Sequence, residues 1–453
     1  MQTIYCCRLP RLQATEYSHT KKRNRNGPSR DLGALRLRRT IGKGFIHTIM
    51  QKVATFDSSW LHEITGAQPA TANLLKEKPE EQERLGYFHT LREICSQPAS
   101  WLVTGDQLAG ANTLLTKCVA DVSSIILTGS GSSLYAGECA RLGLQKELSV
   151  TVTAAGGDSL LLHGLAAFPA SRPCLVVSLA RSGDSPESCG AVSFLKESDP
   201  ALRHLVLTCN PRGRLATLYR DDPSVQVIAL DERTNDRSLV MTNSFTNLVL
   251  AARSLGKVYD VDSFRVLYQT LSRIAQKLIT THFGTLADVA NRNFNRSLFL
   301  GSGARYGAAR ESSLKMLELT SGRVPAICET YLGLRHGPLS YVDQDTLVVC
   351  FLSSNPTLRA YELDLIQELE SKKLGLLKLI VGDHMPAQLA KPDNVLIDCP
   401  ELAEVGDDNA PMIDVVCGQL LAFFRCLKEG LRPDSPSQNG AINRVVQPFQ
   451  IHR

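Results

Sequence analysis

The chain has 453 residues, of which 43% are hydrophobic and 21% are charged, the proportions of a globular protein with room for two domains. No apolar run approaches the roughly 18 residues that a membrane-spanning helix needs. The formal net charge of +5 comes from the amino end, where residues 1–49 hold eleven Lys and Arg against Glu16 and Asp31. The remainder is mildly acidic and gives no reason to expect nucleic-acid binding.

Residues 1–49 form a basic leader with three interpretations. It could be a nucleic-acid-binding arm, an Arg-rich organelle transit peptide, or a disordered or misassigned extension that precedes a working start at Met50. The leader has no sustained amphipathic period and no apolar segment of the kind that a signal peptide carries. We favour the third interpretation and leave these residues out of the fold prediction.

The thirteen cysteines do not form a disulfide or metal-binding pattern. Apart from Cys6 and Cys7 they stand singly, mostly inside apolar runs, with no C-x-x-C and no Cys/His spacing of a zinc site. We therefore predict reduced, buried cysteines in a cytoplasmic protein. No metal and no cofactor is expected.

In chain order, residues 50–104 are predicted to form amphipathic helices. Trp60–Ile64 and Tyr87–Ile94 place apolar side chains three or four positions apart, which is the period of a helix face. We expect this segment to pack on a neighbouring subunit or domain.

Residues 105–258 are predicted to form a first α/β domain. Short apolar runs alternate there with helix-length segments, the pattern of right-handed βαβ units and a parallel sheet. The predicted strands are 124–128, 149–154, 174–179, 204–208 and 225–230.

A connecting helix is predicted over 259–284, followed by a second α/β domain over 285–430. The helix predicted at about 411–429 is apolar on most sides, and residues 431–453 form a polar tail. The predicted strands of this second set lie near 297–301, 325–328, 346–352, 377–381 and 394–398.

The two predicted domains repeat each other at a fixed offset. An apolar strand breaks into a small-residue loop at Gly129, and the same happens at Gly301, 172 positions later. The strands that begin at Leu175 and Leu347 keep the same spacing. Chance similarity between short apolar runs does not predict a common offset, so we infer tandem copies of one α/β unit.

Two small-residue loops in the first copy are suited to a phosphate group. Gly129–Ser133 and Ala180–Glu187 each precede a predicted helix, so backbone amides at the carboxyl edge of the sheet would face an anion. Hydroxyls with little fixed positive charge favour a phosphoester. Helix capping alone explains one such loop better than two, and neither loop has the full dinucleotide or P-loop motif. The hydroxyls belong to Ser130, Ser132, Ser133, Ser182, Ser185 and Ser188.

Three charged residues stand together in the second copy. Glu311, Lys315 and Glu318 fall at i, i+4 and i+7 of a predicted helix and therefore share one face. Such a trio is most often a solvated surface, but apolar residues surround it here. A carboxylate beside a Lys in an apolar setting is how an enzyme prepares a proton-transfer base. Further on, His336 lies in a Gly/Pro turn, where a His on its own is more often incidental than catalytic.

Taken together, these residues resemble the sugar isomerase (SIS) domain family, which includes the isomerase half of glucosamine-6-phosphate synthase. A closer similarity, over about 85–453, is to the galactosamine-6-phosphate deaminase/isomerase (AgaS) group, also labelled tagatose-6-phosphate ketose/aldose isomerase. The motifs that carry this similarity are Arg181–Ser188, Asp236-Arg237 with Met241-Thr242, Arg335–Ser340 and Asn443–Val446.

The resemblance implies an α/β fold of tandem SIS domains, each a flavodoxin-like or Rossmann-like three-layer αβα sandwich with a parallel sheet. The phosphate loops would lie in 105–258, the catalytic helix and the His loop in 285–430, and the tail 431–453 would close the site. Ala180 stands where related synthases have a further phosphate-binding Ser. By resemblance, Ser132, Ser133, Ser182 and Ser185 would hold the sugar phosphate, supported by Gly131, Gly183, Glu311 and Thr242.

The resemblance also implies catalytic roles. Glu318 would move a proton between C2 and C1 of the sugar, and Lys315 would stabilise the developing oxyanion or tune Glu318. His336 would assist ring opening in the site of a neighbouring subunit, so a homo-oligomer is expected. Arg444 occupies the place of the synthase's carboxyl-terminal Lys.

The favoured function is conversion of galactosamine 6-phosphate to tagatose 6-phosphate and ammonia. A plain ketose/aldose isomerase would use the same residues, so the residues alone leave this alternative open. A non-catalytic sugar-phosphate sensor usually adds a helix-turn-helix or loses the base, and this chain keeps Glu318 and His336. A synthase would need a long amino-terminal glutaminase domain, whereas Cys6 sits in a short basic leader. The expected partner is therefore a small sugar phosphate, with no nucleic acid and no membrane.

Overall fold

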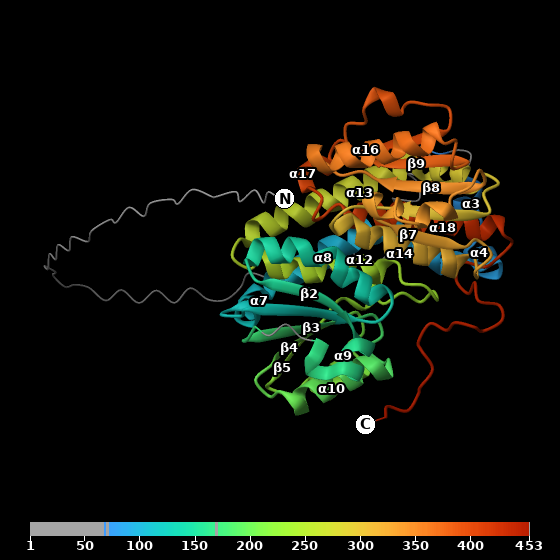
Figure 1. The fold of residues 1–453 in the computed structure, drawn as a ribbon. Coiled ribbons are helices and arrows are strands. Elements are labelled where there is room, and N and C mark those ends of the chain that lie inside the picture. Colours follow the sequence, from blue (N-terminus) through green and yellow to red (C-terminus); the bar gives the residue numbers. More distant parts are fainter. Residues whose placement is uncertain (1–67, 69–71, 168–170, 453) are drawn as a thin grey trace, which may run out of the picture. The chain divides into compact units, whose positions relative to one another are not determined.

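The computed structural model describes residues 68, 72–167 and 171–452, all of which belong to one unit that spans Phe56–Arg453. Two parallel five-stranded sheets organise this unit (Figure 1). The basic leader, Cys6, Cys7 and most of the predicted helical residues before Ala72, including Trp60, lie outside the described residues.

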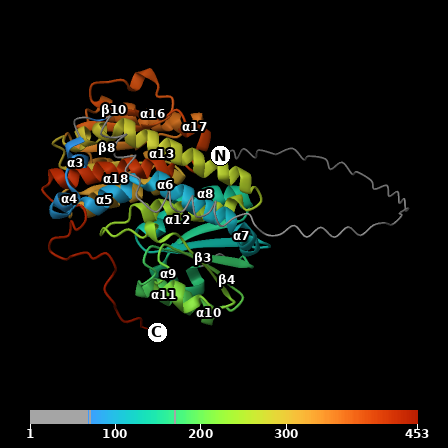
Figure 2. The same ribbon diagram turned by 180° about the vertical axis from the view of Figure 1, so that it is seen from behind.

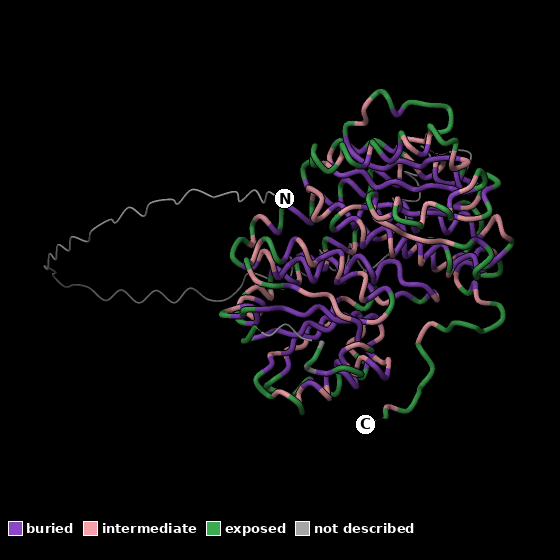
Figure 3. Tube along the Cα trace, in the orientation of Figure 1, coloured by how far each residue is buried: buried purple, intermediate pink, exposed green. Residues whose placement is uncertain are grey.

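The first sheet has the strand order β2-β1-β3-β4-β5, and all its neighbouring strands are parallel. The central strands β1 and β3 are buried along their whole length, because helices cover both faces of the sheet (Figure 3). The edge strands β2 and β5 are partly exposed. The strands are β1 (Ser124–Gly129), β2 (Thr151–Gly156), β3 (Cys174–Ala180), β4 (Arg203–Thr208) and β5 (Val225–Ala229).

The second sheet has the order β10-β9-β8-β6-β7, again with parallel neighbours. Counted from the first strand of each sheet, the two orders are the same, so the predicted tandem repeat is confirmed. All predicted strands lie within two residues of the observed ones. The strands are β6 (Arg296–Leu300), β7 (Ala326–Glu329), β8 (Thr346–Phe351), β9 (Leu377–Gly382) and β10 (Asn394–Asp398).

Four helices form a shared layer between the sheets (Figure 1). The largest apolar cluster runs through this layer and joins Leu127 of the first sheet to Val349 of the second. α18 lies inside the cluster, which explains why its sequence is apolar on most sides. The four helices are α8 (Ser132–Leu148), α12 (Asn243–Ser254), α14 (Ala304–Leu319) and α18 (Pro411–Lys428).

Further helices cover the outer faces, so each sheet is the middle layer of an αβα sandwich, as predicted. Apolar side chains of α9 and α10 pack on the first sheet, and those of α16 pack on the second. The outer helices are α9 (Gly157–His163), α10 (Pro186–Ser198), α11 (Arg214–Tyr219), α15 (Tyr331–Leu334) and α16 (Pro356–Ser371), while α17 (Leu402–Val405) packs on α13.

The helices before β1 pack on the shared layer of the same chain. α6 lies along α13 and α12, and α5 contacts α18 (Figure 2). α13 runs past the predicted end of the connecting helix at 284, because Leu286 and Val289 continue its buried face. These helices are α3 (Ala72–Lys76), α4 (Pro79–Leu85), α5 (Phe88–Cys95), α6 (Gln97–Gly110), α7 (Asn112–Val119) and α13 (Val261–Ala290).

The repeated glycines have a common physical cause. Gly131 and Gly303 precede α8 and α14 with φ of 56° and 59°, a region that favours glycine. A side chain on Gly129 would lie 2.6 Å from Ser133 Cβ, and one on Gly301 would lie 2.4 Å from the Arg305 carbonyl oxygen. The backbone of each strand end therefore turns tightly against the helix that follows.

The described cysteines follow the prediction as well. All eleven are free thiols, and all except the half-buried Cys328 are buried. Among the described residues, none of the helices is both long and apolar enough to cross a lipid bilayer.

Candidate active site

The two serine-rich loops meet at the first switch point, defined here as the carboxyl ends of β1 and β3. From these adjacent strands the chain proceeds in opposite directions across the sheet, the place where α/β proteins bind ligands. Ser132 and Ser133 form the first turn of α8, which begins two residues earlier than predicted, and both are buried. Ser182 and Ser185 are half-buried and lie just before α10.

The hydroxyls at this point are sparsely used by the chain itself. Ser130 Oγ is buried and has no hydrogen-bond partner among the described residues. Ser182 Oγ accepts from the Asp184 amide at 3.2 Å, and Ser185 Oγ donates to Ser188 Oγ at 2.7 Å. Ser133 Oγ lies 3.9 Å from Met241 Sδ. Several donors are therefore available to an anionic ligand.

The helical spacing of the charged trio on α14 brings its side chains together. Lys315 Nζ lies 3.3 Å from Glu311 Oε1 and contacts Glu318 Oε2. The same Nζ donates to Ser132 Oγ at 3.2 Å. The trio of the second copy thus touches the first serine-rich loop of the first copy, which no sequence motif shows directly.

Burial controls the charges of the trio. Lys315 and Glu311 have no exposed side-chain surface, whereas Glu318 is 23% exposed. Burial raises the pKa of Glu311 to about 7, against the lowering effect of the Lys315 ammonium. Burial alone would lower the pKa of Lys315, but the two carboxylates raise it, so the ammonium stays charged. Only Glu318 combines contact with this ammonium and access from outside.

Two predicted residues are not brought to the trio. His336 lies exposed on the turn after α15, and its ring makes no hydrogen bond or ion pair to the described residues. Arg444 donates from Nε to the Asp236 carbonyl oxygen at 2.7 Å and from Nη2 to Asn235 Oδ1 at 2.6 Å. The carboxyl-terminal tail is therefore attached to the loop between β5 and α12.

Buried carboxylates hold that loop, and sequence reasoning missed their roles. The Asp236 carboxylate accepts from the amides of Thr242, Asn243 and Ser244 at the start of α12. Glu93 accepts from the Ser238 amide at 3.2 Å, and burial together with the Asp236 charge raises the pKa of Glu93 to about 8. Little in the sequence indicates this role for Glu93. Its neighbours on the same face of α5 include the polar Thr90, so the face has the pattern of an exposed surface although it is buried.

Arg181 was also missed as a link between the loops. Its guanidinium donates to the Leu239 carbonyl oxygen at 2.9 Å and to the Arg444 carbonyl oxygen. Burial lowers the pKa of Arg181, and the nearby Asp236 and Glu318 charges oppose that effect. Arg181 therefore ties the end of β3 to the tail beside the trio.

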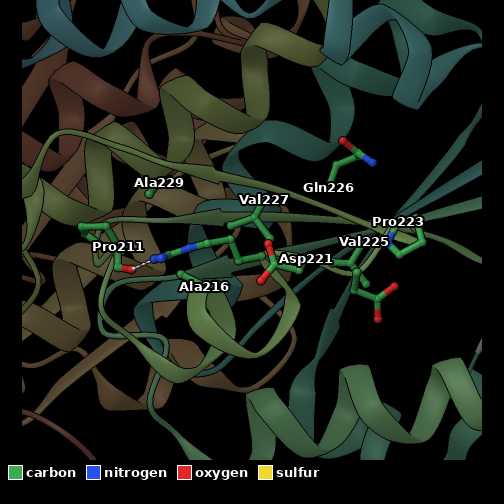
Figure 4. Close-up of a pocket in the computed structure, with 10 residues that line it drawn as sticks. Pro211, Ala216, Asp221, Pro223, Val225, Gln226, Val227 and Ala229 are labelled. Carbon is green, nitrogen blue, oxygen red and sulfur yellow. Dashed lines mark hydrogen bonds between the residues drawn. The ribbon is translucent and has the colours of Figure 1, made fainter.

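A pocket of about 440 Å³ opens elsewhere, beside the edge strand β5 (Figure 4). Val227 and Ala229 of that strand line it, and Arg220 Nη2 donates to the Pro211 carbonyl oxygen at 3.3 Å. None of the predicted site residues lines this pocket. The candidate active site at the first switch point is therefore separate from this pocket.

The strand order, the serine loops and the charged helix define a class of protein, the tandem SIS proteins. No protein-family model matches the chain. The chain is 32% identical over 376 residues to the D-galactosamine-6-phosphate deaminase AgaS of Escherichia coli, covering 80% of this chain and 95% of that relative. It is 31% identical over 380 residues to the D-galactosamine-6-phosphate deaminase AgaS of Shewanella sp. strain ANA-3, covering 82% and 94%. The chain therefore belongs to the AgaS family.

A solved structure supports the same assignment. The crystal structure of tagatose-6-phosphate ketose/aldose isomerase from Escherichia coli matches with a TM-score of 0.72 at 28% sequence identity. The match covers 80% of this chain and 96% of that one. The similarity thus includes both sheets and the helices between them.

Proposed function

We propose that this protein deaminates and isomerises galactosamine 6-phosphate to tagatose 6-phosphate and ammonia. The observation that carries the proposal is the position of Lys315, whose buried ammonium contacts both Glu318 and Ser132. A proton-transfer group and a phosphate-binding loop are thereby joined through one side chain. The names of the AgaS relatives supply the substrate class.

The first switch point would hold the sugar phosphate. Four serines lie at the amino end of α8 and in the loop before α10: Ser132, Ser133, Ser182 and Ser185. Amides and hydroxyls at helix amino ends are good ligands for a phosphate dianion. Gly131 and Gly183, with φ of 56° and 68°, allow both loops to turn closely around it.

Glu318 would act as the base. It removes the proton from C2 of the open-chain amino sugar, and the electron pair forms an enolamine between C1 and C2. Return of a proton to C1 gives a ketimine at C2. Water then adds to C2 and ammonia leaves, so one water is consumed and one ketose phosphate is formed. Charged Lys315 would hold the Glu318 carboxylate and stabilise negative charge that develops on the C1 oxygen.

His336 would act in the site of a second subunit, where it assists ring opening. Its exposed ring and its lack of partners within the described residues support this placement. Thr242 and Glu311 would support the site, Thr242 through its bond to Asp236 and Glu311 through Lys315. Arg444 would position the tail over the first switch point.

An assay of both products tests the proposal. The purified protein is incubated separately with galactosamine 6-phosphate, glucosamine 6-phosphate and tagatose 6-phosphate, and ammonia is measured beside ketose and aldose phosphates. We expect equal amounts of ammonia and ketose from galactosamine 6-phosphate. Ketose/aldose interconversion of tagatose 6-phosphate without any deamination would support the isomerase alternative, and binding without turnover would indicate a sensor.

A further inference from the structure

The internal repeat gives the first switch point a counterpart in the second sheet. The second switch point is defined here as the carboxyl ends of β6 and β8, the adjacent strands from which the chain proceeds in opposite directions. At the offset of 172 positions, Ser182 corresponds to Ser354, and Ser133 corresponds to Arg305. A second anion-binding point would be expected there from topology alone.

At the second switch point, carboxylates of the same chain accept the hydrogen bonds that a bound anion would otherwise accept. Asp407 accepts from the Ser354 amide at 2.9 Å and from the Ser353 hydroxyl. Glu362 accepts from the Ser353 amide at 2.7 Å. The Ser354 hydroxyl donates to Asp383 at 2.7 Å. Each amide and hydroxyl of this serine pair therefore donates to a side chain of the chain.

The charged side chains around the serine pair are mostly buried. Glu362 is 1% exposed, and its Oε1 has no hydrogen-bond partner among the described residues. Arg305 is fully buried, is bonded to Asp414, and has Nη1 3.7 Å from Asp407 Oδ1. The Asp407 side chain is 22% exposed, so it is the member of this cluster that closes the point toward the outside.

The first switch point differs in the use of its serine amide and in the direction of the loop carboxylate. Among the described residues, nothing accepts a hydrogen bond from the Ser182 amide. Asp236, in the loop that corresponds to the loop of Asp407, directs its carboxylate to the start of α12 instead. The same fold therefore leaves one switch point available and closes the other.

We infer that Asp407 is a built-in anion that occupies the second switch point in place of a ligand, so that each chain offers a single sugar-phosphate site. Removal of the Asp407 carboxylate then uncovers a latent site for a small carboxylate anion, because the Ser353 hydroxyl and the Ser354 amide lose their acceptor. The description of the remaining site as a sugar-phosphate site rests on the proposed function, whereas the role of Asp407 in the second sheet does not.

The test uses Asp407→Gly in the full chain, with sodium formate as the probe. Thermal unfolding is measured in formate and in chloride at equal ionic strength. We expect a midpoint lower than that of the wild type by about 2–4 °C or more in chloride, and recovery of much of the loss in formate. A variant that does not fold in chloride is refolded in formate, where recovery of folded protein supports the inference.

Two control variants make the result specific. Asp407→Asn keeps an acceptor at the same place and should show no formate effect. Asp408→Gly alters the next residue, whose carboxylate pairs with Lys146 at 3.8 Å at the surface, and should also show none. The inference is overturned if Asp407→Gly is as stable as the wild type, or if formate stabilises it no more than it stabilises Asp408→Gly. It is also overturned if Asp407→Gly refolds in neither salt.

A second measurement needs no unstable variant. Equilibrium dialysis of the wild type with inorganic phosphate should give at most one bound phosphate per chain. Two bound phosphates, one of which survives the double substitution Ser133→Ala and Ser182→Ala, would overturn the inference. The formate result does not involve the first switch point, so a failure of the proposed function is seen separately in the ammonia assay.

Discussion

At the scale of single residues, the site depends on how buried charges are paired. Lys315 has no exposed side-chain surface and contacts two carboxylates. A buried ion pair contributes modest net stability, but removal of one partner leaves an uncompensated charge that is costly. The trio therefore responds as a unit to substitution.

Substitution of Lys315 tests this coupling. Lys315→Met should lower the free energy of unfolding by about 3–5 kcal/mol, because Glu311 and Glu318 lose their shared counter-ion. Adding Glu311→Gln to that variant removes one buried charge and should recover part of the loss without restoring turnover. Urea unfolding at pH 7 measures both variants. A double variant that is no more stable than Lys315→Met would show that the two residues are not energetically coupled.

Substitution of Ser182 tests the phosphate loop. Ser182→Ala should raise KM for the sugar phosphate by the worth of one hydrogen bond, about 1–2 kcal/mol or roughly 5- to 30-fold, with a smaller change in kcat. Ser193→Ala is the matched control, since Ser193 lies on α10 but pairs with Tyr219 at 2.8 Å, away from the loop. Steady-state kinetics measure both variants. If both keep the wild-type KM, this loop does not bind the phosphate group.

At the scale of elements, β4 carries a pH-sensitive group outside the site. His204 is 3% exposed, and neither ring nitrogen has a hydrogen-bond partner among the described residues. Burial lowers the pKa of His204 to about 4, and the charge of Lys196 adds to that effect. In the unfolded chain the pKa returns to its ordinary value of about 6.5, so the unfolded state binds the proton more readily.

The stability of the fold should therefore decline as the pH falls from about 6.5 toward 4. Between pH 7 and pH 5, His204 should contribute a loss of about 2 kcal/mol. Guanidinium unfolding at the two pH values should give a smaller loss for His204→Leu than for the wild type. An equal loss in both proteins would mean that His204 does not carry the acid sensitivity.

The elements themselves follow closely from local sequence, and the exceptions are informative. The strands were predictable because apolar runs in a covered parallel sheet need no alternation. The end of α13 was predicted too early, at Gly284. A side chain at Gly284 would lie 2.4 Å from Gln68 Oε1, so this glycine serves a contact with a distant residue and does not end the helix.

Some features of the candidate site also follow from local sequence, and others do not. The serine loops and the α14 trio are local patterns, and their spacing was enough to predict them. The contact of Lys315 with Ser132 joins residues 183 positions apart, and the hydrogen bond from the Ser238 amide to Glu93 joins residues 145 positions apart. No spacing rule reaches such pairs, because the packing of α14 and α5 creates them. The catalytic and binding roles of all these residues remain predictions, and for His336 and Arg444 so does their proximity to the trio.

At the scale of the whole molecule, the exposed His336 and the tail suggest that the site is completed by more than one segment. Ile451 of the tail reaches α10, since a side chain on Gly190 would lie 2.4 Å from Ile451 Cδ1. The tail thus passes from the Arg444 contacts to the outer helix of the first sheet. His336 has no such attachment within the described residues.

Subunit mixing tests whether His336 acts on a neighbouring chain. Glu318→Gln and His336→Ala should each be nearly inactive alone. Dissociation and joint reassembly should restore activity, to about a quarter of the wild-type value for a dimer. Random reassembly makes about half of the dimers mixed, and each mixed dimer carries one intact shared site out of two. Mixtures that stay inactive, or a fully active His336→Ala variant, would contradict a shared site.

Transfer of the C2 proton by Glu318 is the decisive step of the proposed reaction, and isotopic labelling at that carbon tests this step. Galactosamine 6-phosphate with deuterium at C2 is given to the wild type and to Glu318→Gln. We expect the wild type to remove the label from C2 in every turnover, with a primary isotope effect, as ammonia and tagatose 6-phosphate form. Glu318→Gln should do so about 10²- to 10⁴-fold more slowly, since the amide cannot accept a proton. A hexose phosphate that keeps deuterium on C2, or removal of the label by Glu318→Gln at the wild-type rate, would contradict the account.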